Sequence, residues 1–107
     1  MSRLSIKRQL RIELRDAQAA FLWGPRKVGK STFLRQRFPA AMQLDLLDSD
    51  LRTRLTIRPA LLRERVLRER PRLVILDEVQ KVPALLDEVH WLIENTKTRF
   101  VLCGSSA

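Results

Sequence analysis

The residues with the strongest chemical signal form one run near the start of the chain, GPRKVGKS at positions 24–31. The run matches the pattern G-x-x-x-x-G-K-[ST], in which a glycine-containing loop binds phosphate groups. Gly24 and Gly29 let the backbone bend so that successive amide N–H groups point at phosphate oxygens. A helix that begins near Lys30 directs the positive end of its dipole at the same anion. The run therefore predicts a site for nucleotide phosphates.

Two residues of this loop have individual roles. We expect Lys30 to reach the β- and γ-phosphates and the Ser31 hydroxyl to coordinate Mg²⁺. An apolar stretch precedes the loop and a helical pattern follows it, which is the strand–loop–helix context that the motif requires. The competing interpretation is an ordinary turn that contains glycine, and the flanking elements count against it.

A pair of adjacent carboxylates follows a second apolar stretch, LVILDEVQ at positions 73–80. Four apolar residues indicate a buried strand, and its carboxyl end carries Asp77 and Glu78. We expect Asp77 to hold the Mg²⁺ shell and Glu78 to orient or deprotonate an attacking water. A solvated acidic turn after a core strand is the alternative.

Glycine usage identifies a third segment of the same site. The chain has three glycines, of which two lie in the phosphate loop and the third, Gly104, follows the apolar run FVLC. Ligands of parallel α/β sheets bind at the carboxyl ends of the strands. We therefore expect Gly104, Ser105 and Ser106 to lie beside the phosphate site.

The apolar patterns predict an α/β fold in three layers. Strands are expected at 18–23, 42–46, 73–76 and 99–103, and helices at 30–37, 59–70 and 83–95. Strands that alternate with helices favour a parallel sheet with helices on both faces. Ile6, Leu10 and Leu14 recur at helical spacing and predict a short amphipathic helix in residues 1–16. Residues 17–107 then form the nucleotide-binding core of a single domain.

The composition of the chain argues against membrane, secreted and disulfide-rich proteins. The longest apolar run, AAFLW, is too short to span a membrane, and no secretory signal is present, so we expect a cytoplasmic protein. The single cysteine, Cys103, excludes an internal disulfide framework and a cysteine-based zinc site and is expected to be buried. The net charge of +9 indicates either a nucleic-acid surface or a solvated arginine-rich face. The pairs Glu64–Arg68 and Arg65–Glu69, at i,i+4 spacing, favour the solvated face.

Four segments together carry a family resemblance: GPRKVGKST, LDLLDSD, VILDEVQKVP and FVLCGSS. They resemble the N-terminal part of the bacterial and archaeal AAA-type ATPases, in the branch with proline and arginine inside the phosphate loop and a DE-[IV]-Q-K-V-P motif. The resemblance extends from about residue 3 to the last residue. It implies that VILDE is the Walker B strand and that Ser105, or alternatively Ser106, is the sensor of the γ-phosphate. It also implies a Walker A loop whose nucleotide-binding residues are Gly24, Pro25, Arg26, Lys27, Val28, Gly29, Lys30, Ser31 and Thr32.

The same resemblance implies a strand order of 5-1-4-3-2, counting the Walker A strand as the first. We therefore expect a P-loop core with strand order 1-4-3-2 that is truncated after its fourth strand. The fifth strand, the lid region and the C-terminal domain of the family would be absent, together with any arginine finger and second sensor that lie beyond the fourth strand.

Three functions remain open at this point. The first is ATP–Mg²⁺ binding and hydrolysis by an AAA-type ATPase domain, for which the fragment itself is slow or inactive. The second is a nucleotide-binding module without turnover, and the third is an arginine-rich nucleic-acid-binding protein with an accessory nucleotide site. A GTPase fits less well, because Asp77 does not begin a D-x-x-G motif. Trp91 is expected on a polar helix face, either as a contact with a partner or a further part of the chain, or as a single exposed aromatic.

Overall fold

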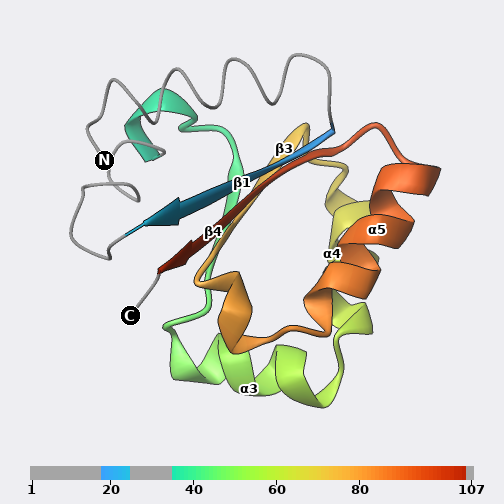
Figure 1. The fold of residues 1–107 in the computed structure, drawn as a ribbon. Coiled ribbons are helices and arrows are strands. Elements are labelled where there is room, and N and C mark those ends of the chain that lie inside the picture. Colours follow the sequence, from blue (N-terminus) through green and yellow to red (C-terminus); the bar gives the residue numbers. More distant parts are fainter. Residues whose placement is uncertain (1–17, 25–34, 106–107) are drawn as a thin grey trace.

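The structure is a computed structural model that describes residues 18–24 and 35–105 (Figure 1). Residues 35–37 are helical and belong to the predicted helix 30–37, whereas the predicted helix within residues 1–16 lies outside the described residues. The remaining elements, in chain order, are β1 (Ala19–Gly24), β2 (Met42–Asp45), α3 (Ser49–Ile57), α4 (Ala60–Glu69), β3 (Leu73–Asp77), the 3₁₀ turn η1 (Val79–Lys81), α5 (Leu85–Asn95) and β4 (Arg99–Ser105).

The four described strands form one parallel sheet in the order β1-β4-β3-β2. This order confirms the one that the family resemblance implies. β4 lies in the centre, where Cys103 is in register with Leu22 of β1 and with Asp77 of β3. The carboxyl ends of all four strands therefore meet at one edge of the sheet.

The burial of each strand follows from its place in the sheet. Val74, Ile75 and Leu76 of β3 are buried in succession, because the strand is covered on both faces. β2 alternates instead, with Met42 and Leu44 buried and the residues after them exposed, as expected for an edge strand covered on one face.

Two apolar clusters occupy the two faces of the sheet. The larger one lies between the sheet and α3, α4 and α5, and it includes Leu76, Leu92 and Phe100, each with an exposed fraction of 0%. In Figure 1 these three helices lie on the same side of the strands. The smaller cluster contains Leu22, Cys103 and their neighbours, with Phe38 packed against it. The burial of Cys103 agrees with its expected role as a small apolar side chain.

One helix was not predicted from the sequence. α3 follows β2 after a short turn, and the side chain of Asp48 caps it by accepting hydrogen bonds from the backbone N–H groups of Asp50 (3.0 Å) and Leu51 (3.4 Å). Only Leu55 of this helix is buried, so its apolar periodicity is weak. The Asp-Ser-Asp sequence at its start was the available signal, because aspartate is a preferred N-cap residue.

The surface of α5 differs in part from the prediction. The apolar spacing of the helix predicted at 83–95 places Leu85, Leu86, Val89, Leu92 and Ile93 on one face. Leu85, Val89 and Leu92 are buried as expected, but Leu86 is 41% exposed. Residues 85 and 86 differ by 100° around a helix, so both cannot lie at the centre of one buried face. Trp91 is 37% exposed, and the guanidinium carbon of Arg63 lies 5.3 Å from its ring centroid. Part of the Trp91 ring is therefore covered from α4 by a cation–π contact.

We expect the 107-residue chain to self-associate through β1, the outermost strand on one side of the described sheet. Edge strands without charge or proline recruit other strands, and AAFLW in β1 carries neither. Light scattering should show an apparent mass that rises with concentration. Phe21→Lys, at a position 39% exposed, should reduce this rise, whereas Leu67→Lys on α4, at 40%, should not. A chain that stays monomeric at all concentrations would show that this edge does not drive association.

Candidate nucleotide site

The residues expected to bind nucleotide and metal converge at the carboxyl edge of the sheet. Gly24, the first residue of the phosphate-loop motif, is in register with Ser105 on β4. Asp77 ends β3 and is in register with Cys103, two residues before Ser105. Residues more than 80 positions apart in the sequence thus end side by side, because parallel strands bring their carboxyl ends to the same edge.

The backbone of Glu78 has an unusual conformation. Its φ of 60° and ψ of 45° place it in the left-handed region, which few residues other than glycine adopt. Arg70 also has a positive φ, but it caps the C-terminus of α4, where that conformation is common. Glu78 instead lies between β3 and η1, at the point where the chain turns away from the sheet. Such strained positions concentrate at functional sites.

The Glu78 side chain is buried and hydrogen-bonded. Only 2% of the residue is exposed. Its Oε1 atom accepts hydrogen bonds from the Ser105 hydroxyl at 2.8 Å and from the Gln80 side-chain amide at 3.1 Å. These donors offset part of the cost of removing a carboxylate from water. The contact also joins two of the predicted catalytic residues, Glu78 and Ser105, across 27 positions of sequence.

Two further residues of this edge were not predicted from the sequence. Gln80 follows the carboxylate pair in the motif DEVQ, and no role for it was predicted. Asp45 ends β2 in register with Asp77, and its Oδ1 accepts a hydrogen bond from the Leu47 N–H at 2.9 Å. The strand predicted at 42–46 places Asp45 inside the strand, so its position at the carboxyl edge became apparent only in the structure.

The described residues contain no cluster of three or more histidine, cysteine, aspartate or glutamate side chains that could hold a metal ion by themselves. The chemistry of this edge suits Mg²⁺ bound together with phosphate, because Mg²⁺ typically uses one or two carboxylates, substrate oxygens and water. Asp77, which is half-buried, would be the carboxylate in such a shell. Residues Pro25 to Thr32 of the loop, and Ser106, lie outside the described residues, so their roles stay predictions.

Comparison with known families supports the interpretation of the fold. A family model described as "AAA domain" matches residues 16–107. The chain belongs to the AAA-domain family. No curated protein and no solved structure matches it. The match covers β1, β3 and β4 and the edge at which they end, so the residues just described belong to the AAA domain itself. Membership indicates a nucleotide-binding function of the ATPase type.

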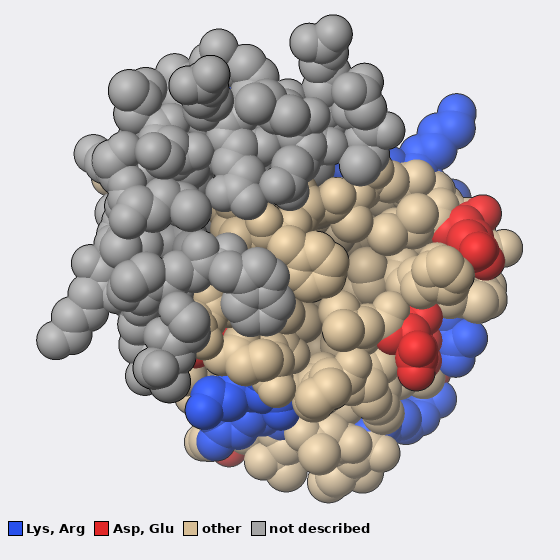
Figure 2. Space-filling view, in the orientation of Figure 1, with Lys and Arg blue, Asp and Glu red and all other residues tan. Residues whose placement is uncertain are grey.

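The surface of this AAA domain bears on the nucleic-acid alternative. On the face shown in Figure 2, positive and negative side chains lie close together on the right-hand side, and much of the described surface is uncharged. The ion pair expected at Arg65–Glu69 forms, with a nitrogen–oxygen distance of 3.0 Å. The pair expected at Glu64–Arg68 does not, because Glu64 pairs with Arg58 instead.

Within the described part of the chain, no helix has the length and apolar character needed to cross a membrane.

The hydrogen bond between Ser105 and Glu78 should contribute measurably to stability. Ser105→Ala leaves a buried carboxylate with one donor fewer, so the free energy of unfolding should fall by about 1–3 kcal/mol. The same substitution in a Glu78→Ala background should cost much less, because the acceptor is gone. Urea denaturation of the four proteins completes this double-mutant cycle. Equal costs in the two backgrounds would contradict the pairing.

Proposed function

We propose that the chain binds ATP with Mg²⁺ at the carboxyl edge of its sheet and forms the hydrolytic core of an AAA-type ATPase. The hydrogen bond from Ser105 to Glu78 is the observation that carries the proposal most directly. This bond joins Ser105, the expected γ-phosphate sensor, to Glu78, the expected general base. Gly24, where the phosphate-loop motif starts, lies beside Ser105 on the neighbouring strand β1. A solvated acidic turn, the alternative interpretation of Asp77 and Glu78, does not account for a glutamate with 2% exposure.

The proposed roles follow from the chemistry of each group. The backbone N–H groups of the loop from Gly24 to Thr32, except at Pro25, which has none, would hold the phosphates together with Lys30, and Ser31 and Asp77 would hold Mg²⁺. The bound Mg²⁺ would neutralise charge that develops on the phosphate oxygens. Glu78 orients the attacking water and accepts its proton as the water oxygen bonds to the γ-phosphorus and the bond to the leaving ADP oxygen breaks.

The hydrogen bond of Ser105 indicates how this residue could sense the γ-phosphate. A hydroxyl donates one hydrogen bond at a time, and in this structure Ser105 donates to Glu78. If Ser105 turns its hydrogen to a γ-phosphate oxygen, Glu78 loses that donor and keeps Gln80. Binding of the triphosphate would therefore remove one hydrogen bond that holds the Glu78 carboxylate, the group expected to act on the attacking water. Gln80 is then a positioning residue for Glu78 instead of a group that touches the substrate.

A nucleotide-binding module without turnover remains the alternative for the chain by itself. An arginine finger contributes about 10³–10⁵ to the rate of phosphoryl transfer in related classes of enzyme. The motif brings Lys30, with Arg26 and Lys27, to the phosphates, but we assign no residue of the chain to the finger. Slow turnover by the isolated chain is therefore compatible with an ATPase role in a complete assembly.

Nucleotide affinity should depend on Lys30. Lys30→Ala removes the charge that meets the β- and γ-phosphates, and the dissociation constant for fluorescent ATP should rise at least about tenfold, equivalent to about 1.4 kcal/mol. Lys97→Ala, which removes the same charge from an exposed position before β4, is the matched control and should bind as the wild type does. Equal affinities of the two variants would contradict the assignment of the phosphate loop.

Turnover should be slow in the 107-residue chain. With saturating ATP and Mg²⁺, phosphate release should stay well below about one per second, the lower end of ordinary enzyme rates. Glu78→Gln should remove the remaining activity and leave ATP binding intact, because it removes the base but no phosphate contact. Turnover near one per second that Glu78→Gln abolishes would show that the chain needs no added arginine finger. Activity unchanged by Glu78→Gln would contradict the role of Glu78.

A further inference from the structure

A concave site lies away from the carboxyl edge, between α3, α4 and β2. It is a pocket of about 170 Å³ whose floor is made of leucines from three elements. These are Leu44 of β2, Leu51 and Leu55 of α3, and Leu61 and Leu62 of α4. Leu51 and Leu61 are half-buried, so part of this apolar floor remains accessible. We call this site the α3–α4 pocket.

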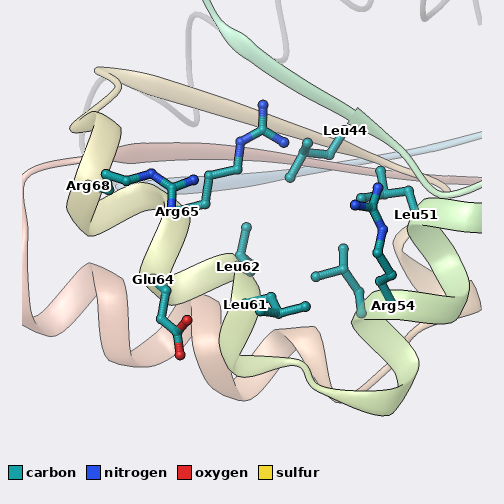
Figure 3. A pocket seen from close by; sticks show the side chains of 9 residues that line it. Leu44, Leu51, Arg54, Leu61, Leu62, Glu64, Arg65 and Arg68 are labelled. Atoms are coloured by element: carbon teal, nitrogen blue, oxygen red, sulfur yellow. The ribbon is translucent and has the colours of Figure 1, made fainter.

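Three arginines surround the leucine floor: Arg54 of α3, and Arg65 and Arg68 of α4. In Figure 3 the Arg65 side chain extends from α4 toward Leu44, while Glu64, which also lines the pocket, points away from the leucine floor. Glu69 is shared between Arg65 and Arg68, at nitrogen–oxygen distances of 3.0 and 3.7 Å. Among the described residues, no carboxylate pairs with Arg54. The rim therefore carries more positive charge than its own carboxylates neutralise.

Glu64 does not cancel this excess. The Arg58 guanidinium donates hydrogen bonds to both carboxylate oxygens of Glu64, and this contact lowers the pKa of Glu64 below its ordinary value. Glu64 is thus ionised at neutral pH and is held by a residue that does not line the pocket. Across the group formed by Arg54, Arg58, Arg65, Arg68, Glu64 and Glu69, the charge remains positive.

We propose that the α3–α4 pocket binds an acidic peptide segment of a partner protein through one large apolar side chain. The volume sets the size of the anchor, because a leucine-lined cavity of about 150 Å³ is large enough to hold a benzene ring. A phenylalanine or leucine therefore fits the floor. Carboxylates on either side of this anchor meet the rim, since a guanidinium pairs with a carboxylate through two parallel hydrogen bonds.

Two observations favour a peptide partner over the other occupants. A nucleic acid would use the arginines through its phosphates but leave the leucine floor exposed, because phosphate contacts supply most of its affinity. A second copy of the chain offers the acidic apolar stretch LDLLDSD at positions 44–50, but this stretch is already built into β2 and α3. Its Asp48 side chain caps α3, so the stretch is not available as an extended segment.

The test is fluorescence polarisation with a labelled peptide that has one phenylalanine among glutamates. The purified protein should bind this peptide without nucleotide. Replacing the phenylalanine with serine, or the glutamates with glutamines, should each weaken binding by at least about tenfold. These two control peptides separate the contribution of the leucine floor from that of the arginine rim.

Protein variants locate the binding site. Arg54→Ala, at an exposed position, should weaken peptide binding by at least about tenfold. Arg72→Ala removes the same charge from an exposed position before β3 and should have no effect. Absence of peptide binding, equal binding of the glutamine peptide, or equal effects of the two variants would overturn the proposal. Tighter binding of a single-stranded oligonucleotide with the same dependence on Arg54 would assign the pocket to nucleic acid. Self-association that Arg54→Ala abolishes would assign it to a second copy.

Discussion

The parallel pairing of β4 with β1 on one side and β3 on the other is the constraint on which the rest of the structure depends. It places the start of the phosphate-loop motif, Ser105 and the Asp77–Glu78 pair at one edge, although these residues come from the two ends of the chain and from a strand between them. Burial holds this register in place, because Phe100 and Leu102 belong to the larger apolar cluster on one face, and Val101 and Cys103 to the smaller cluster on the other. A slip by one residue would move each of these side chains to the opposite face.

The turn after β3 brings the Glu78 carboxylate to the edge where the strands end. A regular strand would place successive side chains on opposite faces of the sheet. The left-handed conformation of Glu78 interrupts the alternation and begins the 3₁₀ turn, in which the Lys81 N–H donates to the Glu78 carbonyl oxygen at 3.0 Å. The carboxylate is then within reach of donors on β4 and on the turn itself. The backbone strain and the burial of the carboxylate both reduce stability, and hydrogen bonds from Ser105 and Gln80 offset part of that cost.

The arginine content of the chain has more than one structural use. Arg63 covers part of the Trp91 ring and also pairs with Glu88, which ties α4 to α5. Arg58 and Glu64 tie the connection between α3 and α4 to the first turns of α4. Arg54, Arg65 and Arg68 surround the α3–α4 pocket. A net charge of +9 is therefore not by itself a sign of a nucleic-acid surface, because Arg58, Arg63, Arg65 and Arg68 make specific contacts with a carboxylate or an aromatic ring.

The sequence by itself determined the fold class, the strands and the identity of the chemical groups. Continuous apolar runs marked β3 and β4, because strands buried on both faces need no polar alternation. Family resemblance then supplied the strand order, which local patterns do not contain. Only the tertiary structure decided that Ser105 contacts Glu78, that Gln80 shares this acceptor and that Asp45 lies beside Asp77. These contacts depend on strand register and on the backbone angles of one turn, which arise from packing over the whole sheet. The helix α3 carried a capping aspartate in its sequence, but with one buried leucine it lacks apolar periodicity, and its place was decided by packing against β2 and α4.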